Sequence, residues 1–392
     1  MHRANFFWRM RRLILILLIA WFATSHTSVA AHHKYLAYVG TYTDHGSKGI
    51  YAYRFDSASG KLTPLGLGAE SANPSFLADD SDGKYLYAVN ETETFHGQPT
   101  GAVSAFAIHP NDGKLSLLNQ VSSRGQDPAH IVLDRTGKYA LVANYTTGSV
   151  AVFPVLQDGR LGDATSFVQH KGSSVDPERQ AGPHAHAIAL SPDDRFAIVA
   201  DLGLDELLVY RFDSATGTLG PNPQVVHAAP GAGPRHLAFG HNGKFLYVLN
   251  EMKSTVATYS YDAATGTLHE AQNVPALARP VTKDDTAAEI EVHPSGKFLF
   301  TSNRGDDSIA VFAIDQRTGM LTRIESDPTG GKTPRHFALD PTGKWLLAEN
   351  LDSGNIVVFR IDRKTGRLTQ TGETVQVPSP VCVIFVAERN RK

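Results

Sequence analysis

Charged side chains recur in this chain at the two ends of short apolar runs. Where one set of runs begins, the sequence carries His130, His184, His186, Arg235, His236, Glu289, Arg335 and His336. Where another set ends, it carries Glu251 after Asn250 and Arg304 after Asn303. Guanidinium groups capture carboxylate or phosphate through paired hydrogen bonds, and a carboxylate beside them can act as a base or position water. These residue types favour chemistry on a small anionic molecule.

Arg235 and Glu251 belong to one stretch, which predicts how the two kinds of position meet. An apolar strand follows Arg235, a turn is expected at Asn242-Gly243, and a β-rich strand returns to Glu251. In an antiparallel hairpin the start of the first strand lies beside the end of the second. We therefore expect the guanidinium of Arg235 to meet the carboxylate of Glu251 at one rim.

The same hairpin recurs along the whole chain. Its turn stands at positions 83, 137, 194, 243, 296 and 343, at intervals of 47 to 57 residues. A second marker, Gly followed two residues later by Leu, closes a third apolar strand at positions 60, 113, 159, 217, 266, 319 and 366. Seven copies of three strands and a less regular fourth predict an all-β fold, a seven-bladed β-propeller.

The two ends of the repeat array predict how the propeller closes. The first copy has no first strand before Tyr35–Gly40, and the last copy is followed by an unpaired first strand, Pro380–Phe385. Pairing of these two segments in one blade would leave no free sheet edge, which is how closed β architectures avoid aggregation. We expect one β-propeller domain over residues 32–392.

Residues 1–31 do not fit that domain. Four arginines between positions 3 and 12 precede the apolar run Leu13–Ala23, and Ser28-Val29-Ala30 offers the small residues that a signal peptidase reads. The apolar run is shorter than the roughly 20 residues of a membrane span. We interpret residues 1–31 as a cleaved signal peptide of a periplasmic or secreted protein. A retained membrane anchor is the alternative, and Arg11-Arg12 leaves twin-arginine export open.

The composition narrows the classes of partner. A net charge of −2 gives no polybasic surface, which argues against nucleic acid, and no membrane association is expected after signal cleavage. Cys382 is the only cysteine, so no internal disulfide forms, and a single Cys in an apolar strand is typical of a small core residue. We expect a monomer or a weak dimer that binds a small molecule.

In a propeller the first strands line the central channel, so the charged residues at their starts converge on one opening. Asparagines at the ends of second strands have a structural interpretation, because Asn commonly holds turn and loop backbone; this applies to Asn90, Asn144, Asn250 and Asn303. A single His or Arg can equally bridge two blades. The number of cationic side chains from different blades favours a binding site.

Two groups of residues at this opening could in principle bind a metal ion. His184 and His186 alternate along one strand and so share a face, which suits a metal ligand pair. No carboxylate stands beside them at a matching spacing, and the surrounding arginines repel a cation. Calcium held by strand-end Asn and Glu residues would need an oxygen cluster without arginines. We therefore expect neither a metal nor another cofactor.

Several motifs of the chain resemble those of a known family: Tyr38–Thr43, Asn73-Pro74-Ser75, Gly182–His186, Gly233–His236, Leu249–Glu251 and Ser302–Gly305. The chain is similar to the seven-bladed propeller lactonases, which include bacterial 6-phosphogluconolactonases of the propeller type and fungal carboxy-muconate cyclases. The resemblance covers residues 34–387 and implies a seven-bladed lactonase.

The resemblance also implies site residues. The proposed catalytic group of the fungal cyclases is a His, an Arg, a Glu and a second Arg, and the matching positions are His186, Arg235, Glu251 and Arg304. The Glu follows the first Arg by sixteen residues in the family and here. The remaining residues of the rim are expected to bind substrate: His130, His184, His236, Glu289, Arg335 and His336.

Lactone hydrolysis needs a base for water, donors for the oxyanion and cations for an anionic substrate. We expect Glu251 to be the base or to position water, and His186 to donate to the carbonyl or ring oxygen. Arg235, Arg304 and Arg335 would hold phosphate or carboxylate. The expected substrate is 6-phospho-D-glucono-1,5-lactone or an unphosphorylated aldonolactone. A muconate-lactone cyclase and a non-catalytic ligand-binding propeller are the alternatives.

Overall fold

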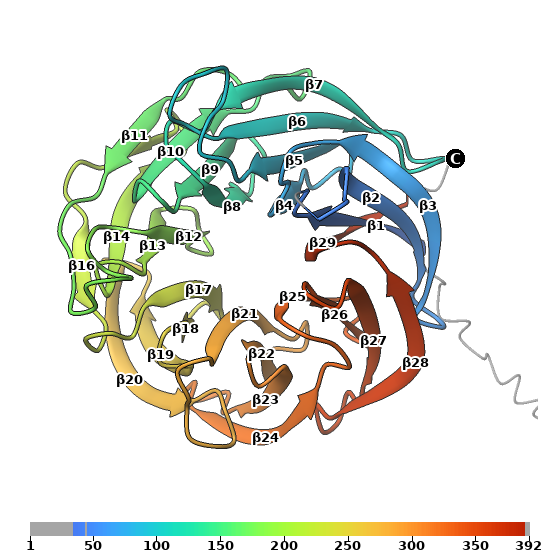
Figure 1. The fold of residues 1–392 in the computed structure, drawn as a ribbon. Coiled ribbons are helices and arrows are strands. Elements are labelled where there is room, and N and C mark those ends of the chain that lie inside the picture. The colour runs from blue at the N-terminus through green and yellow to red at the C-terminus, as the bar shows by residue number, and fades with distance from the viewer. Residues whose placement is uncertain (1–33, 44, 389–392) are drawn as a thin grey trace, which may run out of the picture. The chain divides into compact units, whose positions relative to one another are not determined.

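The computed structural model describes residues 34–43 and 45–388, so the predicted signal peptide lies outside the described residues. The regular secondary structure of these two stretches consists of β-strands. None of the described residues form a helix that could span a membrane. The strands form seven sheets, which Figure 1 shows arranged as the blades of a propeller. The prediction of a seven-bladed β-propeller is confirmed.

Blade 1 joins the two ends of the described chain, and blades 2 and 3 follow it in chain order. Blade 1 contains β29 (Pro380–Ala387), β1 (Lys34–Thr41), β2 (Gly49–Asp56) and β3 (Lys61–Glu70). Blade 2 contains β4 (Leu77–Asp79), β5 (Tyr85–Asn90), β6 (Ala102–Ile108) and β7 (Leu115–Ser122). Blade 3 contains β8 (Pro128–Leu133), β9 (Tyr139–Asn144), β10 (Ser149–Pro154) and β11 (Ser166–Gln169).

The other four blades follow in chain order. Blade 4 contains β12 (Ala185–Leu190), β13 (Phe196–Asp201), β14 (Glu206–Asp213), β15 (Thr218–Leu219) and β16 (Gln224–His227). Blade 5 contains β17 (Pro234–Phe239), β18 (Phe245–Asn250), β19 (Thr255–Asp262) and β20 (Thr267–Pro275). Blade 6 contains β21 (Thr286–Val292), β22 (Phe298–Arg304), β23 (Ser308–Ile314) and β24 (Leu321–Pro328). Blade 7 contains β25 (Pro334–Leu339), β26 (Trp345–Asn350), β27 (Asn355–Ile361) and β28 (Leu368–Gln376).

The first strand of every blade lies nearest the propeller axis (Figure 1). Each first strand contacts the first strand of the next blade, in the closed order β29, β4, β8, β12, β17, β21, β25 and back to β29. Second and third strands are apolar along nearly their whole length because both of their faces pack against neighbouring blades, as the burial of Leu141 and Val152 shows. Residues at the starts of first strands are thereby brought together.

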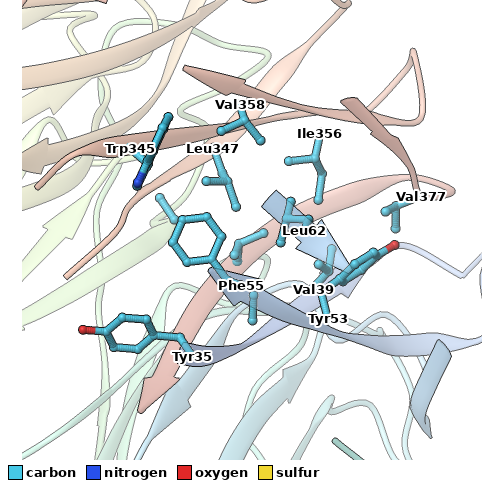
Figure 2. Packing of buried hydrophobic residues seen from close by; sticks show 13 residues of the cluster. Tyr35, Val39, Tyr53, Phe55, Leu62, Trp345, Leu347, Ile356, Val358 and Val377 are labelled. Carbon is cyan, nitrogen blue, oxygen red and sulfur yellow. The ribbon is translucent and has the colours of Figure 1, made fainter. Parts of the chain in front are cut away.

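The ring closes as the chain ends predict. Strand β29 pairs antiparallel with β1, from Tyr35 opposite Ala387 to Thr41 opposite Pro380. Figure 2 shows the apolar cluster behind this closure, in which Phe55 of blade 1 packs near Trp345 and Val358 of blade 7. Cys382 lies in β29 with its side chain fully buried, which agrees with its interpretation as a small core residue.

The glycine of the Gly-x-Leu marker has a packing reason. Gly159 has a φ of +83°, and a Cβ there would lie 2.3 Å from the ring of Tyr85 in the preceding blade. Gly60 repeats the contact at the ring closure, where a Cβ would lie 2.7 Å from the ring of Trp345. The marker therefore reports a contact between neighbouring blades, and this contact sets the repeat that the sequence displays.

Candidate active site

A β-bulge interrupts the start of six of the seven first strands in the described part of the chain. A bulge places one extra, unpaired residue on the strand and re-aims its side chain. The residues at the bulges are Val381, Ala129, His186, Arg235, Ala288 with Glu289, and Arg335. The bulges were not predicted, because side-chain direction was predicted from regular alternation along each strand. They place charged residues such as Arg235 and Arg335 at the same end of the channel.

The second ring of residues stands at the ends of second strands. Tyr42, Glu91, Tyr145 and Glu251 each directly follow such a strand, and Arg304 is the last residue of β22. The asparagines just before four of them have the predicted structural role: the Nδ2 atom of Asn144, for example, donates to the carbonyl oxygen of Ser123 at 3.0 Å. In these four blades the strand end thus supplies one fixed asparagine and one functional side chain.

Two cavities lie where these two rings meet. The larger, of about 200 Å³, is lined by Tyr42, Glu91, Ala129, Tyr145, Arg179, His186, Glu251, Arg304 and Arg335. The smaller, of about 10 Å³, is lined by Ser75, Phe76, Ala129, His186, Arg235, His236, Glu289, Arg335, His336 and Val381. Ala129, His186 and Arg335 line both, so the two cavities adjoin.

Glu251 lies at the centre of an arginine cluster. Its Oε2 atom is 3.0 Å from Nε of Arg235 and 3.0 Å from Nη2 of Arg304, and its Oε1 atom accepts from Nη2 of Arg179 at 2.7 Å. The Glu251 side chain is only 6% exposed. The predicted contact between Arg235 and Glu251 is therefore present, with two further guanidinium groups added to it.

This cluster changes the role expected for Glu251. Burial alone would raise the pKa of its carboxyl group, but the three guanidinium groups outweigh burial and lower the pKa to about 2. A group with so low a pKa is a poor proton acceptor at neutral pH. The expectation that Glu251 acts as the base is at odds with this geometry, which suits a carboxylate that fixes three arginines.

Arg235 lies deeper than the sequence-based argument placed it. Its side chain is 2% exposed and lines the smaller cavity only, and its Nη1 atom donates to the backbone carbonyl of Ala288. Burial, then the charges of Arg304 and Arg335, lower the pKa of its guanidinium to about 10, so it is still a cation at neutral pH. Arg235 was expected to bind the anionic end of a substrate. The arginines that line the larger cavity are better placed for that contact.

Arg335 lines both cavities, and its ion pair with Glu91 is longer than those of the arginines around Glu251. Its Nη2 atom is 3.7 Å from Oε1 of Glu91, and its guanidinium lies 5.1 Å from the centre of the Tyr42 ring. Tyr42 donates its hydroxyl to the same Glu91 oxygen at 2.8 Å. Nε of Arg304 is buried and has no partner among the described residues. Arg335, whose ion-pair partner is 3.7 Å away, therefore keeps donors for a ligand, and Arg304 brings a second guanidinium to the same cavity.

Histidines and glutamates line the smaller cavity in a connected network. Nδ1 of His236 is 2.8 Å from Oε2 of Glu289, and Nε2 of His336 is 3.4 Å from the same oxygen. Nδ1 of His336 is 2.8 Å from Oε2 of Glu349. Burial, then the Glu289 charge, raises the pKa of Glu349 well above its ordinary value, which favours the protonated form that can donate to His336.

The histidines of this network are uncharged at neutral pH. Burial is the largest cause that lowers the pKa of His186, His236 and His336, and Arg235 is among the other causes for each. Neutral imidazole carries one donor and one acceptor nitrogen. Because the carboxylate of Glu289 can only accept, Nδ1 of His236 carries the proton and its Nε2 has a free lone pair.

The structure separates the predicted substrate-binding residues into two groups. His236, Glu289, Arg335 and His336 line the cavities, whereas His130 and His184 line neither. The His130 ring packs 4.3 Å from the ring of Phe76, behind the smaller cavity.

His184 precedes β12, and its ring stacks at 4.6 Å on Tyr145, with Nδ1 3.0 Å from the carbonyl oxygen of the same residue. No three His, Cys, Asp or Glu side chains of the described residues are arranged to hold a metal ion.

Eight residues that line the two cavities were not predicted from the sequence, and five of them have large or charged side chains: Tyr42, Phe76, Glu91, Tyr145 and Arg179. Glu91 and Tyr145 stand at strand ends that the argument had identified, and Tyr42 holds the same place after β1, so the repeat could have found all three. Arg179 lies between β11 and β12, in the longest segment that joins the last strand of one blade to the first strand of the next among the described residues. Only the fold shows that it reaches Glu251.

Fold and site together define a seven-bladed β-propeller with a cationic cavity at the mouth of its central channel. The chain belongs to the lactonase family of seven-bladed β-propellers, whose model matches residues 36–385. This membership confirms the family that the sequence motifs resemble.

Two relatives and one solved structure show how close the similarity is. The chain is 38% identical over 353 residues to a 6-phosphogluconolactonase of Bacillus subtilis, covering 90% of this chain and 99% of the relative. It is 35% identical over 309 residues to a 6-phosphogluconolactonase of Formosa agariphila, covering 77% and 85%. The structure of a periplasmic gluconolactonase of Pseudomonas aeruginosa is similar with a TM-score of 0.85 and 35% identity, covering 91% of this chain and all of that one.

Proposed function

We propose that this protein is a lactonase that hydrolyses a sugar-acid lactone carrying an anionic group, with 6-phospho-D-glucono-1,5-lactone as its substrate. The observation that carries the proposal is the larger cavity, a space of about 200 Å³ that Arg304 and Arg335 line together with His186. The curated relatives named 6-phosphogluconolactonase support the same substrate class.

The charge of the cavity favours an anion. Three guanidinium groups and two carboxylates line it, and Arg235 adds a fourth cation directly beneath. Glu251 already compensates part of this charge through three arginines. Phosphate offers several acceptor oxygens to the remaining donors, and paired hydrogen bonds to guanidinium are the strong form of this contact. Arg304 and Arg335 are therefore proposed to hold the phosphate.

His186 is proposed to act at the lactone group. It stands at the bulge of β12 and lines both cavities, so a lactone lying between the two would meet its ring. A neutral imidazole donates one hydrogen bond without the cost of a buried charge. Donors already in place where negative charge develops contribute strongly to acyl transfer. His186 and Arg335 are the candidates for stabilising the carbonyl oxygen in the transition state.

An unphosphorylated aldonolactone is the second candidate. The similarity to the periplasmic gluconolactonase of Pseudomonas aeruginosa favours it, and so does the signal-peptide pattern of residues 1–31, from which we propose export to the periplasm. Phosphorylated sugars are intermediates of cytosolic metabolism, so an exported lactonase would meet unphosphorylated lactones. The two candidates differ only in the group that Arg304 and Arg335 would hold.

A pH-stat assay of the purified mature protein separates these candidates. 6-Phosphogluconolactone, glucono-1,5-lactone and a muconolactone are supplied in turn, and acid release is compared with the spontaneous rate. The proposal requires the largest kcat/KM for the phosphorylated lactone. A larger value for gluconolactone would favour the second candidate. No acceleration of any lactone would favour a binding propeller and refute the proposed function.

A further inference from the structure

Glu251 is held by three arginines, so another group must activate the water that attacks the lactone. We propose that the smaller cavity holds the attacking water and that His236, oriented by Glu289, is the general base. This inference rests on the proposed lactonase function. It assigns His236 as a catalytic residue and Glu289 as a positioning residue.

The size and lining of the smaller cavity suit a single water molecule. Its volume of about 10 Å³ is close to the space that one water requires. Buried water also needs two to four polar partners. His186, Arg235 and His236 supply polar atoms around this space. Because it shares Ala129, His186 and Arg335 with the larger cavity, a water there lies next to a lactone bound in the larger one.

His236 has the orientation that a base requires. Its Nδ1 atom donates to Glu289 at 2.8 Å, and the carboxylate thereby fixes both the tautomer and the ring plane. The lone pair of Nε2 is then available to accept a proton from water. Glu289 is itself held in place, because its Oε1 atom accepts from the backbone N–H of Ile290 at 2.9 Å. This is the carboxylate–imidazole arrangement that general bases use.

The other candidates for the base are occupied or lack a partner. His336 is engaged at Nδ1 by Glu349, and its Nε2 lies 3.4 Å from Glu289. Nδ1 of His186 is buried with no partner among the described residues, so nothing fixes its tautomer. Of the histidines that line the smaller cavity, His236 alone has a carboxylate on Nδ1 and an unoccupied Nε2.

The reaction balances with one water and no other reactant. The water oxygen forms a bond to the lactone carbonyl carbon as its proton passes to Nε2 of His236, and the C=O π pair moves to the carbonyl oxygen. The C=O bond then re-forms and the ring C–O bond breaks. Its electron pair stays on the ring oxygen, which takes the proton back from the imidazolium. The product is an open-chain hydroxy acid, and the imidazole returns to its neutral form.

The test compares three variants with the wild type. In His236→Asn the amide nitrogen can still donate to Glu289, but the accepting nitrogen is lost. Glu289→Gln keeps the size of the side chain and removes its charge. Glu291→Gln, two residues further along β21, is the matched control, because Glu291 lines neither cavity and burial, then the charge of Glu289, raises its pKa well above the ordinary value. Each variant is assayed for kcat, KM and affinity for the product 6-phosphogluconate.

We expect His236→Asn to lower kcat about 10²- to 10⁴-fold, the usual effect of a positioned base, with KM and product affinity unchanged. Glu289→Gln should lower kcat at least about tenfold, again without a change in KM. Glu291→Gln should match the wild type. A purely structural role of Glu289 would instead change KM and product affinity together with kcat.

Two results would overturn the assignment while the proposed function stands. One is an active wild type whose folded His236→Asn variant keeps its kcat. The other is a loss of kcat in His186→Asn that His236→Asn does not share, which would make His186 the base. If His236→Asn does not fold, Glu289→Gln provides the test. A lower kcat at unchanged KM supports the assignment, and an unchanged kcat overturns it. A wild type without activity on any lactone would refute both the base and the function.

Discussion

Replacement of Glu251 by Gln separates the role of a base from that of a fixed counter-ion. The variant keeps the shape of the side chain but leaves Arg179, Arg235 and Arg304 facing a neutral amide. The folded pKa of Glu251 is about 2 against an ordinary value of 4.5. At about 1.4 kcal/mol per pH unit, this difference corresponds to about 3 kcal/mol of stability at neutral pH. Loss of one partner of a buried ion pair is of the same order.

The pH dependence follows from the sign of the shift. A carboxyl group with a lowered folded pKa stabilises the fold above its unfolded pKa, and the contribution is lost as pH falls from about 4.5 to about 2. The difference in unfolding free energy between wild type and Glu251→Gln should therefore be about 3 kcal/mol at pH 7 and should shrink steadily below pH 4.5. Denaturant unfolding followed by circular dichroism at several pH values measures it.

A surface ion pair gives the matched control, because Asp158 and Arg160 are both about half exposed. Asp158→Asn should change stability far less than Glu251→Gln does, because solvent screens an exposed ion pair. Glu251→Gln should also raise KM, since its arginines lose their fixed positions. The reasoning fails if Glu251→Gln is as stable as the wild type, or if it lowers kcat 10²-fold or more at unchanged KM, because that split marks a base.

Three further predictions concern other parts of the molecule. Arg335→Met should raise KM for 6-phosphogluconolactone more than for gluconolactone, which steady-state kinetics on both substrates would show or contradict. Gly159→Ala should destabilise the fold by about 1–3 kcal/mol more than Gly137→Ala, since both glycines have positive φ but only the first Cβ would meet a neighbour, the Tyr85 ring; equal thermal shifts would disprove the contact. N-terminal sequencing of the exported protein should begin near Ala31, and a start at Met1 would exclude cleavage.

The fold was predictable because its signal repeats seven times. Six copies show the turn and all seven show the Gly-x-Leu marker, which reports a real contact such as that of Gly60 with Trp345. The closing pair of β29 and β1 followed from the missing first strand of the first copy and the unpaired strand after the last copy. The contact between Arg235 and Glu251 was also predictable, since it lies within one hairpin and depends only on antiparallel pairing.

Other features of the site depend on contacts between blades, which the sequence does not display. The bulge that carries His186 breaks the alternation from which side-chain direction is predicted. Arg179 reaches Glu251 from the long segment between β11 and β12, whose length differs from that of the equivalent segments, so the repeat could not point to it. The low pKa of Glu251 is the sum of three guanidinium groups from different segments. Its role therefore could not be judged from the Arg235 contact alone.

The places from which the cavity residues come separate the site from the core. Cavity residues such as Arg235 come from first-strand bulges and others such as Glu251 from the ends of second strands, while the apolar residues between them pack against the neighbouring blades. Replacement of a bulge residue such as Arg335 changes the charge of the cavity and leaves the packing of β25 intact. Substrate preference is then set by very few positions, which is why Arg304 and Arg335, and not the propeller itself, are the residues that should distinguish a phosphorylated lactone from a neutral one.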